Sequence, residues 1–216
     1  MVKLRGSDTS YRIGKVVCLG RNYADHIREL GNEMPSRPVL FIKPASSIIG
    51  AGDQVVIPPY SQECHHEVEL AVLIGRRAKD LTESSALQYV AGYGVAIDLT
   101  LRDVQDDLKK QGLPWEIAKG FDTACPLSDF VPAAQVADPQ ALRITMRVNG
   151  ELRQDGSTAL MLRRIPQILR EISAIFTLEE GDVVLTGTPA GVSAIASGDR
   201  LLAEIEGVGS LEVTVA

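Results

Sequence analysis

The sequence is short of cysteine and of long apolar runs, and each shortage excludes a class of protein. Its three cysteines, Cys18, Cys64 and Cys125, are odd in number and form no Cys-x-x-Cys pair, so we expect neither a disulfide framework nor a zinc site built on them. No apolar stretch reaches the roughly 18 residues that a membrane-spanning helix needs, and no signal-peptide core follows the first five residues. We therefore expect a cytoplasmic protein without a membrane partner.

Positive charge is also in the minority. The chain has 22 lysines and arginines against 28 aspartates and glutamates, for a formal net charge of -6. This balance argues against nucleic acid as the main partner and favours a small ligand. With 216 residues, 45% of them hydrophobic, the chain can bury the core of one domain. We expect residues 1–13 to form a polar N-terminal arm and residues 14–216 to form that domain.

Acidic residues interrupt an apolar pattern between Cys64 and Gly75. Read as one strand, this segment has alternate apolar residues on one face and places Glu67 and Glu69 side by side on the other. A third acid, Asp98, ends the buried strand predicted for the residues just before it. Three carboxylates are the oxygen ligands that Mg²⁺, Mn²⁺ or Ca²⁺ select. The alternative is two glutamates facing solvent and an aspartate capping a helix; residue chemistry alone leaves both open.

A histidine and a glutamate form a second candidate site. The pattern predicts a helix over residues 23–30 that stops at Gly31, so His26 and Glu29, three apart, share a face. They are either an acid/base pair or an ordinary surface pair. The turn-rich residues that follow predict a mobile lid around residues 22–38.

Further polar residues after Asp98 in the sequence are candidates for the same site. A helix over residues 101–111, capped by Thr100 and closed by Gly112, brings Arg102 and Gln105 just beyond that aspartate. Lys119 lies among apolar residues and is either a buried cation or a surface lysine with a buried stem. The glycine-rich residues 185–192 form either a tight turn or a carboxylate-binding loop that includes Thr188.

The rest of the pattern is dominated by strands. Gly-Asp turns at residues 52, 181 and 198 each precede a β-rich segment, and Asn149-Gly150 predicts a hairpin after a strand over residues 142–148. Only residues 165–176 show a long helical period, which predicts a core-facing helix without catalytic content.

Six motifs occur in one order along the chain, and together they resemble the fumarylacetoacetate hydrolase family. The resemblance covers nearly the whole chain from about residue 14. Within the family, the chain is most similar to the single-domain acylpyruvase and oxaloacetate decarboxylase branch. The motifs are Gly20-Arg21-Asn22-Tyr23-x-x-His26, Phe41-x-Lys43-Pro44, His66-Glu67-x-Glu69-Leu70, Asp98-x-Thr100-x-Arg102-Asp103-x-Gln105, Lys119-x-Phe121-Asp122 and Glu180-Gly181-Asp182-x-x-x-Thr186-Gly187-Thr188-Pro189-x-Gly191-Val192.

The resemblance implies an α+β, β-dominated fold, a mixed β-roll of packed sheets with peripheral helices, and a homodimer. It also implies residue roles. Mg²⁺ or Mn²⁺ would be bound by Glu67, Glu69 and Asp98, with Lys119 beside the metal. His26 and Glu29 would be the dyad of a closing lid that activates water. The substrate would be held by Arg21, Arg102, Gln105 and Thr188. His66 would at most support a metal ligand, and His65 would be structural.

The activity implied by the resemblance is that of a divalent-metal-dependent hydrolase. It would cleave the carbon–carbon bond of acylpyruvate-type 2,4-dioxo acids to give pyruvate and a carboxylic acid. Two alternatives use the same site: oxaloacetate decarboxylation and keto–enol tautomerisation of a 2-oxo acid. An alternative of another class is a non-catalytic protein that binds 2-oxo acids.

Overall fold

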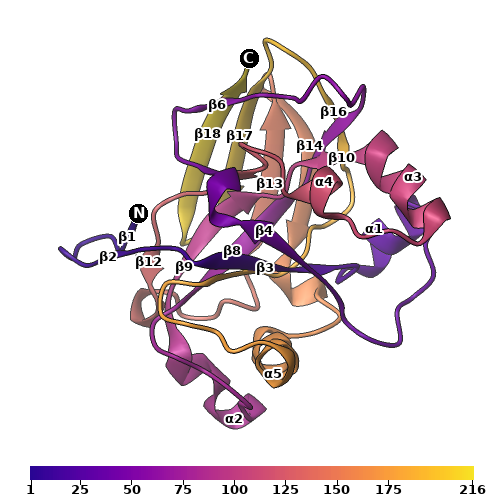
Figure 1. Cartoon of the computed structure of the whole chain (residues 1–216). Coiled ribbons are helices and arrows are strands. Elements are labelled where there is room, and N and C mark those ends of the chain that lie inside the picture. The colour runs from indigo at the N-terminus through magenta and orange to yellow at the C-terminus, as the bar shows by residue number, and fades with distance from the viewer.

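The centre of the molecule is a mixed six-stranded sheet (Figure 1). The computed structural model describes residues 1–216. In this sheet, β15 pairs in parallel with β3 and antiparallel with β8, so it joins segments far apart in the sequence. The strands, in spatial order, are β12 (Val131–Pro132), β9 (Val90–Ile97), β8 (Val68–Ile74), β15 (Val183–Leu185), β3 (Lys15–Gly20) and β4 (Val39–Pro44).

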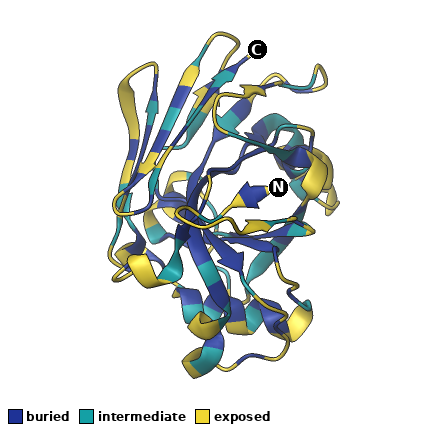
Figure 2. Ribbon diagram, turned by 90° about the vertical axis from the view of Figure 1, so that its left-hand side faces the viewer, coloured by how far each residue is buried: buried dark blue, intermediate teal, exposed yellow.

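A five-stranded sheet packs against the central one. In β17 (Arg200–Ile205) and β18 (Gly209–Val215) of this sheet, buried residues alternate with more exposed ones, so one face of the sheet meets the core and the other meets solvent (Figure 2). Asn149 and Gly150 both have positive φ, 52° and 85°, and form the tight hairpin turn that the sequence predicts. In spatial order the strands are β14 (Glu151–Ser157), β13 (Arg143–Val148), β17 (Arg200–Ile205), β18 (Gly209–Val215) and β6 (Gln54–Val55).

Helices and short strands surround the two sheets. The longest helix, α5 (Ile165–Ile175), buries its apolar face in the main core, as its period predicts. The other helices are α1 (Ala24–Glu29), α2 (Glu83–Ala86), α3 (Arg102–Gln111) and α4 (Glu116–Lys119), with 3₁₀ turns at Ala45–Ser47, Leu87–Tyr89, Ala133–Gln135 and Thr158–Leu160. Three small sheets pair β1 (Val2–Lys3) with β2 (Ser10–Tyr11), β11 (Cys125–Pro126) with β5 (Ile48–Ile49), and β7 (Cys64–His66) with both β10 (Thr100–Leu101) and β16 (Ser193–Ile195).

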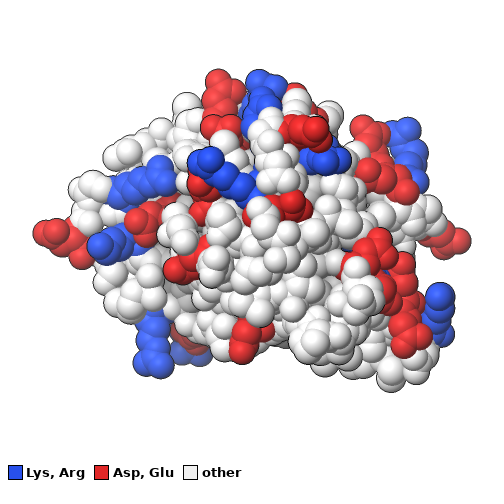
Figure 3. Space-filling model, turned by 90° about the horizontal axis from the view of Figure 1, so that it is seen from above, with Lys and Arg blue, Asp and Glu red and all other residues white.

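This architecture confirms the predicted α+β class, a β-dominated roll of packed sheets with peripheral helices. No helix is long and apolar enough to cross a bilayer. On the face seen in Figure 3, lysines and arginines are interspersed with acidic residues and form no continuous basic area.

Two local predictions were wrong. The segment from Cys64 to Gly75 is not one strand, because it changes sheets at Glu67, which separates β7 from β8. Both faces of β8 are buried, so the apolar alternation carried no sign of that change. Thr100 does not cap α3. The helix begins after Leu101, and the Thr100 hydroxyl instead accepts a hydrogen bond from Lys119.

Candidate metal centre and active site

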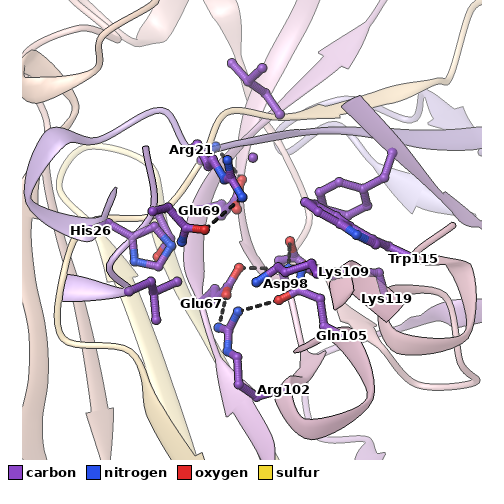
Figure 4. A pocket seen from close by; sticks show the side chains of 17 residues that line it. Arg21, His26, Glu67, Glu69, Asp98, Arg102, Gln105, Lys109, Trp115 and Lys119 are labelled. Carbon is purple, nitrogen blue, oxygen red and sulfur yellow. Dashed lines mark hydrogen bonds and ion pairs between the residues drawn. The ribbon is translucent and has the colours of Figure 1, made fainter. Parts of the chain in front are cut away.

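Three carboxylates meet at the point where β8 begins and β9 ends. The two strands are antiparallel, with Val68 opposite Ile97, so Glu67 and Glu69 at the start of β8 lie beside Asp98 at the end of β9. One oxygen from each lies within 4.8 Å of the others (Figure 4). Their exposed fractions are 5%, 2% and 1%. The solvent-facing and helix-capping interpretations of these acids are therefore wrong.

Of the three acids, only Glu69 forms no ion pair with a lysine or an arginine. Burial and the neighbouring Asp98 and Glu67 raise the pKa of Glu69 well above its usual range. The Glu69 carboxylate accepts one hydrogen bond, from the Gly187 N–H. Lys43 Nζ lies 2.8 Å from Asp98 Oδ1 but outside hydrogen-bond geometry, so this buried oxygen has no hydrogen-bond donor. Buried oxygens of this kind fit a divalent cation such as Mg²⁺ or Mn²⁺.

A buried lysine stands beside the carboxylates. Lys119 is 3% exposed, and its Nζ lies 2.9 Å from Glu67 Oε2 and 2.8 Å from Asp98 Oδ2. Burial disfavours its charged form, but Asp98 and Glu67 outweigh burial and raise the pKa of Lys119. Lys119 is therefore a fixed positive charge and not a surface lysine. Its main-chain carbonyl accepts a hydrogen bond from the equally buried Lys43.

Helix α3 places further polar groups over the same centre. Arg102 forms an ion pair with Glu67 and donates a hydrogen bond of 2.8 Å to Gln105 Oε1. Burial acts to raise the pKa of Glu67, but Lys119 and Arg102 outweigh it and hold that pKa well below its usual range. Glu67 therefore stays ionised.

His26 enters the site from α1. Its Nδ1 lies 3.4 Å from Glu29 Oε2, and Glu29 Oε1 accepts a hydrogen bond of 2.9 Å from the Gly191 N–H. Glu29 thus links α1 to the glycine-rich loop that carries Thr188. Burial lowers the pKa of His26 despite the opposing effects of Glu67 and Glu29, so its imidazole is neutral at pH 7.

One pocket joins almost all the residues that the sequence singled out. Of the residues predicted to bind metal or substrate or to act in catalysis, Glu29 alone does not line it, and it contacts the pocket through His26. The predicted residues that line the pocket are Arg21, His26, Glu67, Glu69, Asp98, Arg102, Gln105, Lys119 and Thr188. Lys109 and Trp115 also line it, and neither was predicted as a site residue from the sequence. The signal for Lys109 was its helical spacing, since it follows Gln105 by four residues and Arg102 by seven.

Comparison with known proteins decides the family. Residues 15–216 match the family described as fumarylacetoacetate (FAA) hydrolase C-terminal. The chain belongs to the fumarylacetoacetate hydrolase family. The family predicted from the six motifs is therefore confirmed.

Similar proteins are named as oxaloacetate tautomerases or as a fumarylpyruvate hydrolase. Rat mitochondrial oxaloacetate tautomerase FAHD1 is 51% identical over 200 residues, which cover 93% of this chain and 90% of that protein. Escherichia coli oxaloacetate tautomerase YcgM is 50% identical over 204 residues, 94% and 93% of the two chains. A structure of fumarylpyruvate hydrolase from Pseudomonas aeruginosa, in complex with Mn²⁺ and pyruvate, superposes with a TM-score of 0.95 at 36% identity and covers 99% of this chain and 94% of that one. The tautomerase relatives fit the keto–enol alternative better than acylpyruvate cleavage.

A buried amide in this family member connects His66 to the pocket. Gln154 Oε1 lies 3.0 Å from His66 Nδ1 and accepts a hydrogen bond of 3.1 Å from the Val68 N–H. Its Nε2 donates to Thr188 Oγ1 and to the Pro189 carbonyl, both at 2.8 Å. Because Thr188 Oγ1 accepts from Gln154, the Thr188 hydroxyl proton is free to donate into the pocket. Gln154 therefore orients a pocket hydroxyl, and none of the six motifs includes it.

Replacing Gln154 by methionine tests this network. The variant keeps similar side-chain volume but leaves His66, Val68 and Pro189 with unpaired buried groups. We expect it to lose about 2–4 kcal/mol of unfolding free energy, measured by urea denaturation. The exposed Gln88→Met variant is the matched control and should change stability by less than about 0.5 kcal/mol. Equal stabilities of the two variants would contradict the network.

Proposed function

We propose that this protein interconverts the keto and enol forms of oxaloacetate at a site for Mg²⁺ or Mn²⁺. The observation that carries the proposal is the pairing of a neutral, buried histidine with a permanently charged lysine in one pocket over three carboxylates. Groups whose environments push their pKa values apart can divide the tasks of proton transfer and charge stabilisation. The tautomerase relatives, about half identical over nine-tenths of the chain, support the choice of substrate.

Each residue has a task in this reaction. The neutral His26 takes a proton from C3 of the keto acid, and Glu29 orients the imidazole and stabilises its charged form. The 2-oxo oxygen gains negative charge and takes a proton from solvent, while the imidazolium of His26 returns its proton to solvent, which gives the enol and restores the neutral histidine. Lys119 and Arg102 supply fixed positive charge to the pocket. Glu67, Glu69 and Asp98 would hold the divalent cation, which when bound supplies a chelating site for a 2-oxo acid and stabilises negative charge on its oxygen.

Acylpyruvate hydrolysis is the second candidate. The contact between His26 and Glu29 favours it, because the same histidine can deprotonate a water that attacks the acyl carbonyl. The fumarylpyruvate hydrolase structure supports it too. Oxaloacetate decarboxylation differs from both, since loss of CO₂ requires no base. The homodimer and the mobility of residues 22–38 remain predictions.

Comparing three rates separates these activities. The protein is saturated with Mg²⁺, and kcat/KM is measured for enol–keto exchange of oxaloacetate, for its decarboxylation and for acetylpyruvate cleavage. We expect the first value to be the largest, and a chelator should abolish it. Faster acetylpyruvate cleavage would make the protein a hydrolase. Metal-dependent binding of oxalate without turnover of any substrate would make it a binding protein.

The pH dependence of exchange tests the base. Burial lowers the pKa of His26 below its ordinary value, so kcat/KM should be flat at neutral pH and fall as the histidine is protonated below about pH 6.5. Glu29 and Glu67 raise this pKa, whereas Arg102 lowers it. The Glu29→Gln variant lacks the Glu29 charge, so the fall of kcat/KM on the acid side of the pH profile (the acid limb) should move to lower pH. A limb that stays in place or moves upward would rule out His26 as the titrating base.

A further inference from the structure

We infer that Lys109 and Arg21 form a subsite for the second carboxylate of a dicarboxylic 2-oxo acid, and so determine the class of substrate. The inference rests on the proposed function, because it assigns the end of the substrate that lies away from the 2-oxo group. Nothing in the six motifs includes Lys109.

The position of Lys109 is the first support. It lies on the face of α3 that carries Arg102 and Gln105, and it lines the pocket with them. Its ammonium lies 5.8 Å from the centre of the Trp115 ring. Figure 4 shows Lys109 and Trp115 on the opposite side of the carboxylates from His26. Lys109 therefore faces the end of the pocket away from the proposed base.

Arg21 provides a second cation with no acidic partner. It follows the end of β3 with φ of +59°, a left-handed conformation that is unfavourable for a residue with a side chain. Its Nη2 donates a hydrogen bond of 2.8 Å to Asn32 Oδ1, which is a neutral acceptor. The arginine lines the pocket and forms no ion pair within the chain. Its charge is therefore available to an anion.

The charged residues around the carboxylates can be balanced against the charges of a bound metal ion and its ligand. Carboxylates bind a metal ion in their deprotonated form, and the three negative charges that Glu67, Glu69 and Asp98 then carry equal the three positive charges of Lys43, Arg102 and Lys119. A divalent cation adds two positive charges, which match one substrate carboxylate and the negative charge that develops on the 2-oxo oxygen.

Arg21 and Lys109 lie outside this balance. The Asp106 carboxylate, 3.1 Å from Lys109 Nζ, cancels one of their two charges. One positive charge is left over, and a second carboxylate would neutralise it.

The surroundings of Lys109 point the same way. Burial lowers the pKa of Lys109, and although Asp106 opposes this, Arg102 and Arg21 lower it further. These like charges repel one another in the half-buried site, and a bound anion would relieve the repulsion. The neutral acyl end of acetylpyruvate has no such effect. The subsite therefore favours oxaloacetate over acylpyruvates of similar length.

A pair of probes isolates the second carboxylate. Malate and lactate are both 2-hydroxy acids, and malate has a carboxylate where lactate has a hydrogen. Their dissociation constants are measured by calorimetry on the full chain with Mn²⁺, for the wild type, Lys109→Met and Lys110→Met. Methionine keeps the apolar stem and removes the charge. Lys110 is the adjacent, exposed lysine of the same helix and does not line the pocket.

We expect the wild type to bind malate more tightly than lactate, and Lys109→Met to reduce malate affinity about tenfold with lactate unchanged. Lys110→Met should change neither, and Lys109→Arg should restore most of the malate affinity. In turnover, Lys109→Met should raise KM for oxaloacetate about tenfold and leave acetylpyruvate within about twofold.

Two results would overturn the inference: a wild type that does not prefer malate to lactate, or a Lys109→Met variant with an unchanged preference. These results are independent of the proposed function. If malate is preferred through Lys109 but oxaloacetate is not turned over, the subsite stands and the tautomerase proposal fails. If oxaloacetate is turned over without that preference, the tautomerase proposal stands and the subsite fails.

Discussion

Replacing Glu69 by glutamine should stabilise the metal-free protein and destroy its metal site. Glu69 is buried beside two other carboxylates and receives one hydrogen bond, from the Gly187 N–H, so its charge opposes folding. Glutamine keeps the shape and removes the charge. We expect the unfolding free energy without metal to rise by about 1–3 kcal/mol, a Tm increase of several degrees. We also expect affinity for Mg²⁺ or Mn²⁺ to fall at least about 100-fold, and activity with it.

Thermal unfolding with a chelator and with saturating metal measures both effects on one sample. The wild type should gain stability from the metal, because a ligand that binds only the folded state raises Tm, whereas Glu69→Gln should gain none. Glu204→Gln, an exposed glutamate on β17, is the matched control and should keep the metal response. If Glu69→Gln lowers the metal-free Tm and still responds to Mn²⁺, the carboxylate cluster is not a metal site.

Replacing His26 by glutamine should separate three reactions that share one pocket. Exchange of oxaloacetate and hydrolysis of acetylpyruvate both require a base, so we expect each to fall about 100-fold to 1,000-fold. Decarboxylation requires none and should stay within about fivefold of the wild type, provided that the metal is bound. The retained decarboxylation also shows that the variant is folded.

The reactions are followed at saturating Mg²⁺, with exchange and hydrolysis read from absorbance and decarboxylation from released CO₂. Equal losses in all three would mean that His26 acts on binding or folding. Undiminished exchange would assign the base to another residue.

The sequence predicted the buried carboxylate cluster because acidic residues at the ends of apolar segments have few explanations. Glu67, Glu69 and Asp98 were identified in this way, and the motifs then identified the family. The change of sheet at Glu67 was not predictable, since β7 and β8 are both buried and a buried strand shows no sign of its partners. Lys43 was visible only as part of a motif. Its burial beside Asp98 depends on hydrogen bonds to the carbonyls of Leu99 and Ala124, which are far from Lys43 in the sequence.

The activity was harder to predict than the site. Cleavage of acylpyruvates, decarboxylation and tautomerisation all use a chelated 2-oxo acid and a stabilised negative charge, so the same residues suit all three. What distinguishes the substrates is the group at the far end, a carboxylate or a neutral acyl chain. We propose that Lys109 binds the carboxylate at that end. This lysine belongs to none of the six motifs and is recognised only by its position in the pocket.

The most direct test of this account is a crystal structure with Mn²⁺ and oxalate, using the anomalous signal of manganese. We predict one anomalous peak bound by Glu67, Glu69 and Asp98, with oxalate chelating the same ion on the side that faces His26 and Arg102. An anomalous peak elsewhere, or oxalate bound without contact to the ion, would contradict the claim that the substrate is held through a metal at the three buried carboxylates.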